Sequence, residues 1–155
     1  MDFSLSDEQQ LFRDSARRFL QEQCHAKVLR ELEGSPKGFS ETLWRAIAAQ
    51  GWTGIIVPER YGGSQLGFLE LGVLLEEIGA AAFDSPFFSN LMATLAILAG
   101  GSAGQKEQFL PAIANGTMIV SPGAAIAWAR LAKPSFEPSV TTTSFAGSSF
   151  TPNRR

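Results

Sequence analysis

A chain of 155 residues that is 45% hydrophobic is long enough to bury a core and to form one globular domain. Its net charge of -2 and its pI near 5.4 give no overall basic surface of the kind that binds nucleic acid, so we expect no nucleic-acid partner. Cys24 is the single cysteine and has only His25 beside it, which excludes an internal disulfide and leaves no set of metal ligands. The acidic, polar N-terminus is unlike a signal peptide, and with the lone cysteine it predicts a cytoplasmic protein.

The first two predicted helices each begin at a serine. Ser6 and Gln9 have the spacing of a capping box, and the helix after them carries apolar residues three and four positions apart, namely Leu11, Phe12, Ala16, Phe19 and Leu20. Ser40 precedes a shorter helix whose apolar stripe is Leu43, Trp44, Ile47 and Ala48. Gly51 ends this second helix, because glycine tolerates the left-handed conformation found after helix C-termini.

An ordered loop and a third helix follow. Pro58 and the pair Gly62-Gly63 indicate a fixed turn after the short apolar run 55–57. Residues 69–78 resume helical spacing and are apolar on most sides, which predicts a helix surrounded by others. Glu76 and Glu77 are adjacent and would point about 100° apart on a helix, so they cannot converge on one substrate atom and are expected on a solvated face.

The fourth and fifth predicted helices are separated by glycines. The fourth begins at Ser85-Pro86 and ends at Gly100-Gly101, and residues 85–105 carry no charge. Its densest apolar part, residues 91–99, is much shorter than the roughly 20 residues that a membrane span needs, so we expect a buried helix and no span. The fifth begins with the capping-box pair Ser102 and Gln105 and places Phe109, Leu110 and Ile113 inward before Gly116.

The sequence changes character after a β-branched apolar run at 117–120. Residues 121–155 contain ten Ser or Thr, four Pro and one acidic residue, against fourteen acidic residues in 1–120. Low hydrophobicity without periodicity predicts a tail of low order, in which 124–132 could form a marginal helix. We therefore predict a helical domain at 1–120 and an irregular tail at 121–155.

Three local features have functional and structural interpretations. The "YGGSQLG" segment at 61–67 lacks the Lys followed by Ser or Thr, and the preceding strand, of a phosphate-binding loop, so a turn is the better interpretation. His25 lies in a polar run without a nucleophile or a second acid at a recognisable spacing, which favours a surface histidine. An apolar stripe in the fourth helix could be core or one wall of a ligand pocket; it comprises Phe87, Phe88, Leu91 and Leu95.

Three segments together resemble a known family. They read "FSLSDEQQLFRDSARRFL" from residue 3, "LWRAIAAQGWTGIIVPERYGGSQLGFLELGVLLEEIG" from residue 43 and "QKEQFLPAIANG" from residue 105. In order and spacing they resemble the N-terminal all-α domain of the acyl-CoA dehydrogenases. The resemblance implies an orthogonal five-helix bundle over about residues 3–120. It also implies the family's activity, the FAD-dependent α,β-dehydrogenation of acyl-CoA thioesters, in which a glutamate removes the α-proton.

The resemblance stops where the family's active site begins. In the family, a β-domain carrying Thr-Glu-Pro and Gly-Ser-Asp segments follows the counterpart of residues 116–120, and neither segment occurs here. The base is also carried by a later domain, so we expect no catalytic residue and no FAD binding in this chain alone. By resemblance, Phe87, Phe88, Leu91 and Leu95 would line the acyl chain of an acyl-CoA substrate.

The leading expectation is therefore an acyl-CoA dehydrogenase-like domain in a truncated form, with the tail produced by a shifted reading frame. A second hypothesis is a non-catalytic subunit or helical interaction module that docks on a complete flavoprotein, in a homo- or hetero-oligomer. A third is a remnant without a function of its own. An exposed apolar face would favour the docking module.

Overall fold

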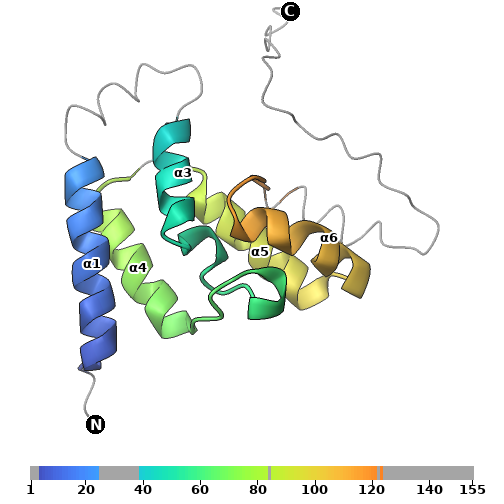
Figure 1. The fold of residues 1–155 in the computed structure, drawn as a ribbon, viewed down its shortest axis with the longest axis horizontal. Coiled ribbons are helices and arrows are strands. Elements are labelled where there is room, and N and C mark those ends of the chain that lie inside the picture. Colours follow the sequence, from blue (N-terminus) through green and yellow to red (C-terminus); the bar gives the residue numbers. More distant parts are fainter. Residues whose placement is uncertain (1–3, 25–38, 84, 122, 124–155) are drawn as a thin grey trace, which may run out of the picture.

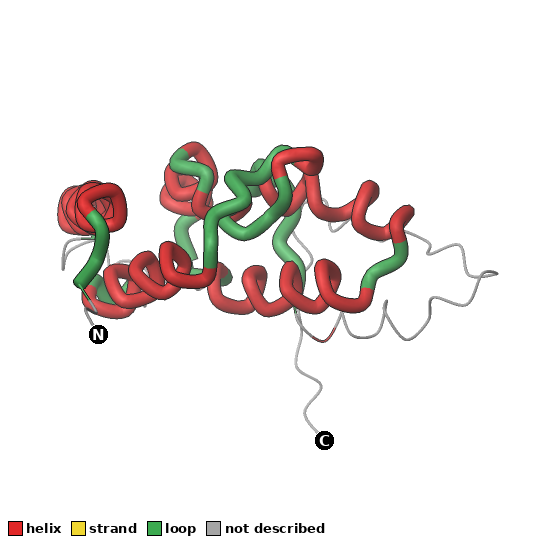
Figure 2. The backbone as a smooth tube through the Cα atoms, turned by 90° about the horizontal axis from the view of Figure 1, so that it is seen from below, coloured by secondary structure: helices red, strands yellow, loops and turns green. Residues whose placement is uncertain are grey.

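The structure is a computed structural model that describes residues 4–24, 39–83, 85–121 and 123. The described residues contain five α-helices, two 3₁₀ turns and no strand (Figure 1). The elements are α1 (Asp7–Gln23), α3 (Glu41–Ala49), η1 (Trp52–Gly54), η2 (Glu59–Tyr61), α4 (Phe68–Ala80), α5 (Phe87–Gly100) and α6 (Ala103–Ala114). Helix α1 is seen end-on in Figure 2, whereas α5 and α6 run across the picture, so the bundle is orthogonal as expected.

The helices begin where the local sequence predicts. The hydroxyls of Ser6, Ser40 and Ser102 each accept a hydrogen bond from the backbone N–H three residues later, at 3.2 to 3.3 Å. Each bond satisfies one of the backbone donors that a helix N-terminus leaves without an intrahelical partner. Helix α5 differs, because Pro86 occupies its cap position and the Ser85 hydroxyl accepts a bond from the N–H of Phe87.

The loop between α3 and α4 is ordered, as the sequence predicts. Gly51 follows α3 with φ +77°, the left-handed conformation expected of it. Further along, the chain doubles back so that residues 64–66 donate backbone hydrogen bonds to residues 54–57 at 2.8 to 3.0 Å. Gly63 makes this approach possible, because a Cβ at that position would lie 2.1 Å from the carbonyl oxygen of Val57.

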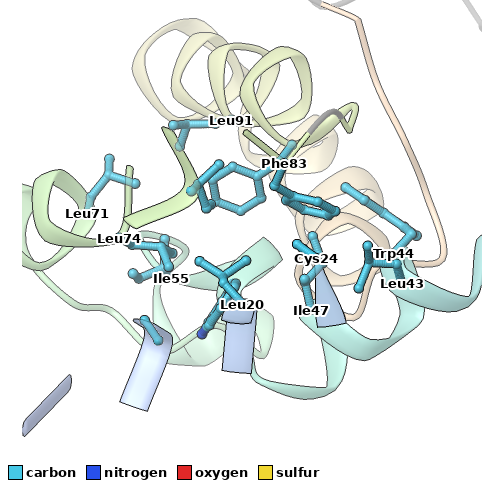
Figure 3. Packing of buried hydrophobic residues seen from close by; sticks show 14 residues of the cluster. Leu20, Cys24, Leu43, Trp44, Ile47, Ile55, Leu71, Leu74, Phe83 and Leu91 are labelled. Carbon is cyan, nitrogen blue, oxygen red and sulfur yellow. The ribbon is translucent and has the colours of Figure 1, made fainter. Parts of the chain in front are cut away.

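Two clusters of buried side chains make up the core. The larger one lies between α1, α3, α4 and α5, where Figure 3 shows residues such as Leu20, Ile47, Leu74 and Leu91 converging. The second lies between α5, α6 and the chain segments around Val57 and Val120. The inward residues expected of the fifth helix, Phe109, Leu110 and Ile113, belong to this second cluster. Helix α5 contributes to both clusters and so connects the two halves of the domain.

Two expectations about α4 were wrong. Glu77 is buried with 4% exposure and forms a bidentate pair with Arg17 of α1, at 2.7 and 2.9 Å, whereas Glu76 is exposed as expected. The helix is also not surrounded by others, because Phe68 and Leu69 at its start are 73% and 57% exposed. The physical reason is that α4 packs mainly against α1, and Arg17 on the facing side of α1 neutralises the Glu77 carboxylate.

One residue of the first apolar stripe lies outside the core. Leu11 is 72% exposed, whereas Ala16 and Leu20 are buried and Phe12 and Phe19 are partly buried.

Within the described residues, no helix is long and apolar enough to cross a membrane. His25 and the segment 124–155, including the marginal helix considered at 124–132, lie outside the described residues.

Candidate functional site

Helix α5 carries the candidate site that the sequence predicts. It is 14 residues long, contains no charged residue and ends where Gly101 turns into an extended conformation. Its four candidate residues do not share one face. Phe87 and Leu91 are 3% and 5% exposed and belong to the larger core cluster, whereas Phe88 is 59% exposed and Leu95 is partly buried. The structure therefore buries Phe87 and Leu91, exposes Phe88, and leaves Leu95 partly buried against the larger cluster.

Met92, a second partly buried residue beside Phe88, was missed from the sequence and, like Leu95, packs against the larger cluster. Met92 is partly buried and lies four residues after Phe88 and three before Leu95, which is the spacing of one helix face. We call Phe88, Met92 and Leu95 the outer face of α5. The i, i+4, i+7 pattern could have identified Met92, but Leu91 at i+3 gave an equally acceptable pattern, and sequence alone does not fix how the helix is rotated.

Two of the three polar residues of α5 point inward. Asn90 and Thr94 are 2% and 1% exposed, and the Thr94 hydroxyl donates to the carbonyl of Asn90 at 2.7 Å. The Asn90 Oδ1 accepts a hydrogen bond from the backbone N–H of Val120 at 2.9 Å. The helix thus buries Asn90 and Thr94 against the rest of the domain, whereas Ser89 and the Phe88 ring are exposed.

Other candidate features of the described residues do not assemble a reactive site. The "YGGSQLG" segment is a turn held by Val57, as expected, and no group of three His, Cys, Asp or Glu within the described part of the chain could hold a metal ion. Burial raises the pKa of the Cys24 thiol, which disfavours the reactive thiolate.

An open hollow between η2 and α6 is lined by Arg60, Tyr61, Ala103, Glu107 and Pro111, with the Arg60 guanidinium 4.8 Å from the Tyr61 ring centre.

Comparison with known proteins supports the family resemblance. The family model described as acyl-CoA dehydrogenase, N-terminal domain, matches residues 6–117. Isovaleryl-CoA dehydrogenase of Bos taurus is 36% identical over 121 residues, which cover 74% of this chain and 28% of that protein. Acyl-CoA dehydrogenase IpdE2 of Mycolicibacterium smegmatis is 26% identical over 119 residues, covering 76% of this chain and 38% of that protein.

Solved structures give the same result. A variant of the Tcur3481-Tcur3483 steroid ACAD aligns with a TM-score of 0.70 and 35% identity, covering 76% of this chain and 32% of that one. Butyryl-CoA dehydrogenase from Megasphaera elsdenii aligns with a TM-score of 0.60 and 30% identity, covering 77% of this chain and 32% of that one. The chain spans about a third of the length of these relatives. It belongs to the acyl-CoA dehydrogenase family, and its described helices form that family's N-terminal domain.

Proposed function

We propose that the outer face of α5 forms one wall of the acyl-chain pocket of an FAD-dependent acyl-CoA dehydrogenase. The observation that carries the proposal is the exposure of Phe88 on a helix face that has no charge. An acyl chain is recognised by apolar surface, and burying a phenylalanine side chain contributes about 1.5–3 kcal/mol. Phe88 and Leu95 come from the sequence-based candidates, whereas Phe87 and Leu91 support the wall from inside the core.

The wall would bind and orient substrate without performing chemistry. The family's chemistry is supplied by the flavin and by a glutamate base that other domains carry. Residues of the outer face would exclude water from the acyl chain and hold it in a fixed direction. Their contribution would appear as selectivity among acyl groups, because one methylene in an apolar pocket is worth roughly 1–3 kcal/mol.

The described residues do not fit a flavin on their own. The isoalloxazine and pyrophosphate need hydrogen-bond donors and acceptors, whereas the outer face is apolar and Asn90 and Thr94 point into the core. We therefore propose that the chain by itself binds no FAD. Titrating the 155-residue protein with FAD under equilibrium dialysis tests this, since stoichiometric retention of flavin would refute it.

A domain exchange tests the proposed wall. Residues 1–120 would replace the corresponding domain of the Bos taurus isovaleryl-CoA dehydrogenase, which is 36% identical over 121 residues. The proposal predicts a chimera that retains FAD and oxidises acyl-CoA thioesters. A chimera that binds FAD and folds cooperatively but shows no oxidation of any acyl-CoA would contradict it.

A docking role is the second candidate, and a different exposed region favours it. Leu66, Phe68 and Leu69 are 41%, 73% and 57% exposed at the start of α4, and clustered apolar exposure of this kind marks partner surfaces. One similar solved structure is named as the ChsE4-ChsE5 complex from Mycobacterium tuberculosis. In this alternative, Phe68→Ser would abolish binding to a complete flavoprotein subunit, measured by analytical ultracentrifugation, whereas Phe88→Ser would not.

A further inference from the structure

The chain leaves α6 through a segment that three other elements hold in place. We call residues 114–120 the exit segment. Three side chains bind its backbone: the Thr53 hydroxyl donates to the carbonyl of Ala114 at 2.7 Å, the Trp44 Nε1–H donates to the carbonyl of Gly116 at 2.8 Å, and the Asn90 Oδ1 accepts from the N–H of Val120 at 2.9 Å. These side chains come from η1, α3 and α5, so the exit segment is fixed from three directions.

Gly116 lets the exit segment approach α3. Its φ is +73°, and a Cβ at this position would lie 2.4 Å from the Cβ of Ala48. Both facts require glycine, because L side chains rarely adopt this φ and the neighbouring helix leaves no space. The approach places the Gly116 carbonyl within reach of the Trp44 indole.

The end of the exit segment alternates between the two core clusters. Met118 and Val120 pack against the second cluster, whereas Ile119 packs against the larger one. Alternation with a period of two is the pattern of an extended strand, in which successive side chains point to opposite sides. A shift of one residue would move every side chain to the opposite cluster, so the register matters here.

Of these three side chains, only that of Asn90 binds the far end of the exit segment, at Val120, which lies 30 residues later in the sequence. An amide buried in an apolar helix costs free energy unless it is hydrogen-bonded, and an apolar residue of similar size would avoid this cost. The amide does not bond a neighbour on α5 through Oδ1 but binds the backbone N–H of Val120. Its position therefore defines which residue of the exit segment faces α5.

We propose that Asn90 is a positioning residue that sets the register in which the chain passes from the helical domain to whatever follows Val120. Because Asn90 lies between Phe88 and Met92 in sequence, it ties that register to the same helix that carries the outer face. If the proposed function holds, this link fixes the acyl-chain wall relative to the next domain. The register itself does not depend on that function.

Hydrogen exchange of the Val120 amide in the 155-residue chain, followed by NMR, tests the proposal. Asn90→Leu keeps the branched shape and removes the acceptor, so protection of the Val120 amide should fall at least about tenfold relative to the amides of Leu20 and Leu74. The matched control is Thr94→Val, which removes a buried bond within α5 and should leave the ratio unchanged.

The proposal is overturned if Asn90→Leu lowers protection at Val120 only in step with Leu20 and Leu74. Should Asn90→Leu fail to fold, Asn90→Ser, whose hydroxyl is too short to reach Val120, provides the same comparison. Because exchange is measured without substrate, a normal result here with an inactive chimera would reject the proposed function and leave the register proposal standing.

Discussion

The side-chain amide of Gln9 donates a 2.9 Å hydrogen bond to the Oε1 of Glu70 and so joins the first turns of α1 and α4. Both residues also bind the start of their own helix: Gln9 Oε1 accepts from the N–H of Ser6, and Glu70 Oε2 accepts from the N–H of Gly67. One amide and one carboxylate therefore connect two helix N-termini that lie 61 residues apart in sequence.

This arrangement predicts an acid-sensitive contribution to stability. The hydrogen bond from Gln9, together with backbone hydrogen bonds, lowers the pKa of Glu70 from its usual 4.5. A lowered folded-state pKa stabilises the fold above the unfolded pKa, and this stabilisation is lost as the pH falls through the folded value. Glu70→Gln should therefore cost less than about 1 kcal/mol at pH 7, because solvent screens this partly exposed site, and the cost should shrink as the pH falls through the lowered pKa of Glu70.

Urea unfolding at pH 7, 5, 4 and 3 measures this difference between wild type and Glu70→Gln. A difference that stays constant down to pH 3 would show that the Glu70 carboxylate is not stabilised by folding.

The pair between the half-exposed Arg17 and the buried Glu77 predicts that two neighbouring arginines differ in their contribution to stability. Arg17→Ala would leave the Glu77 carboxylate buried without its partner, which is strongly destabilising. Arg18→Ala, at an exposed position of the same helix, is the matched control and should change the melting temperature little. Adding Glu77→Gln to Arg17→Ala removes the unpaired charge and should recover part of the loss.

Thermal unfolding followed by circular dichroism gives the order of melting temperatures of the wild type and the three variants. Equal melting temperatures for Arg17→Ala and Arg18→Ala would mean that the pair contributes nothing to the fold.

Replacing glycine by alanine should lower the free energy of unfolding at one position and raise it at another. Gly116→Ala introduces a Cβ 2.4 Å from Ala48 at a positive φ, so it should destabilise the domain by about 1–3 kcal/mol. Gly72→Ala lies on the exposed side of α4 with open space around it, so it should stabilise by about 0.5–1 kcal/mol. Chemical denaturation measures both, and a tolerated Gly116→Ala would contradict the close approach of the exit segment to α3.

Two adjacent phenylalanines should behave differently. Phe87→Ala removes a buried ring and should cost about 3–5 kcal/mol, whereas Phe88→Ala should change the free energy of unfolding by no more than about 0.5 kcal/mol. Denaturant titrations of the two variants test which ring belongs to the core. Similar losses for both would mean that the outer face of α5 is covered within this domain.

The sequence predicts the helices well because their determinants are local. Ser6, Ser40 and Ser102 each act on a backbone N–H three residues away, and Gly51 acts through its own φ. The burial of Glu77, which the sequence analysis placed on a solvated face, depends instead on Arg17, 60 residues earlier in the chain. A local sequence pattern cannot identify a partner at that separation.

The candidate site was predictable only in part for the same reason. The charge-free sequence of α5 identifies the helix, but its rotation decides that Phe88 faces outward while Phe87 and Leu91 face the core. That rotation follows from packing against segments distant in sequence, including the bond between Asn90 and Val120.

In the proposed function, the outer face of α5 contacts the acyl chain. The acyl-chain dependence of kcat/KM in the active chimera tests this contact by comparing Phe88→Ala with Leu11→Ala, which removes an even more exposed apolar side chain on α1. Phe88→Ala should shift the preference towards bulkier acyl groups by roughly tenfold, as expected for space opened in an apolar pocket, while Leu11→Ala should leave it unchanged. Identical profiles for the parent chimera and Phe88→Ala would contradict it.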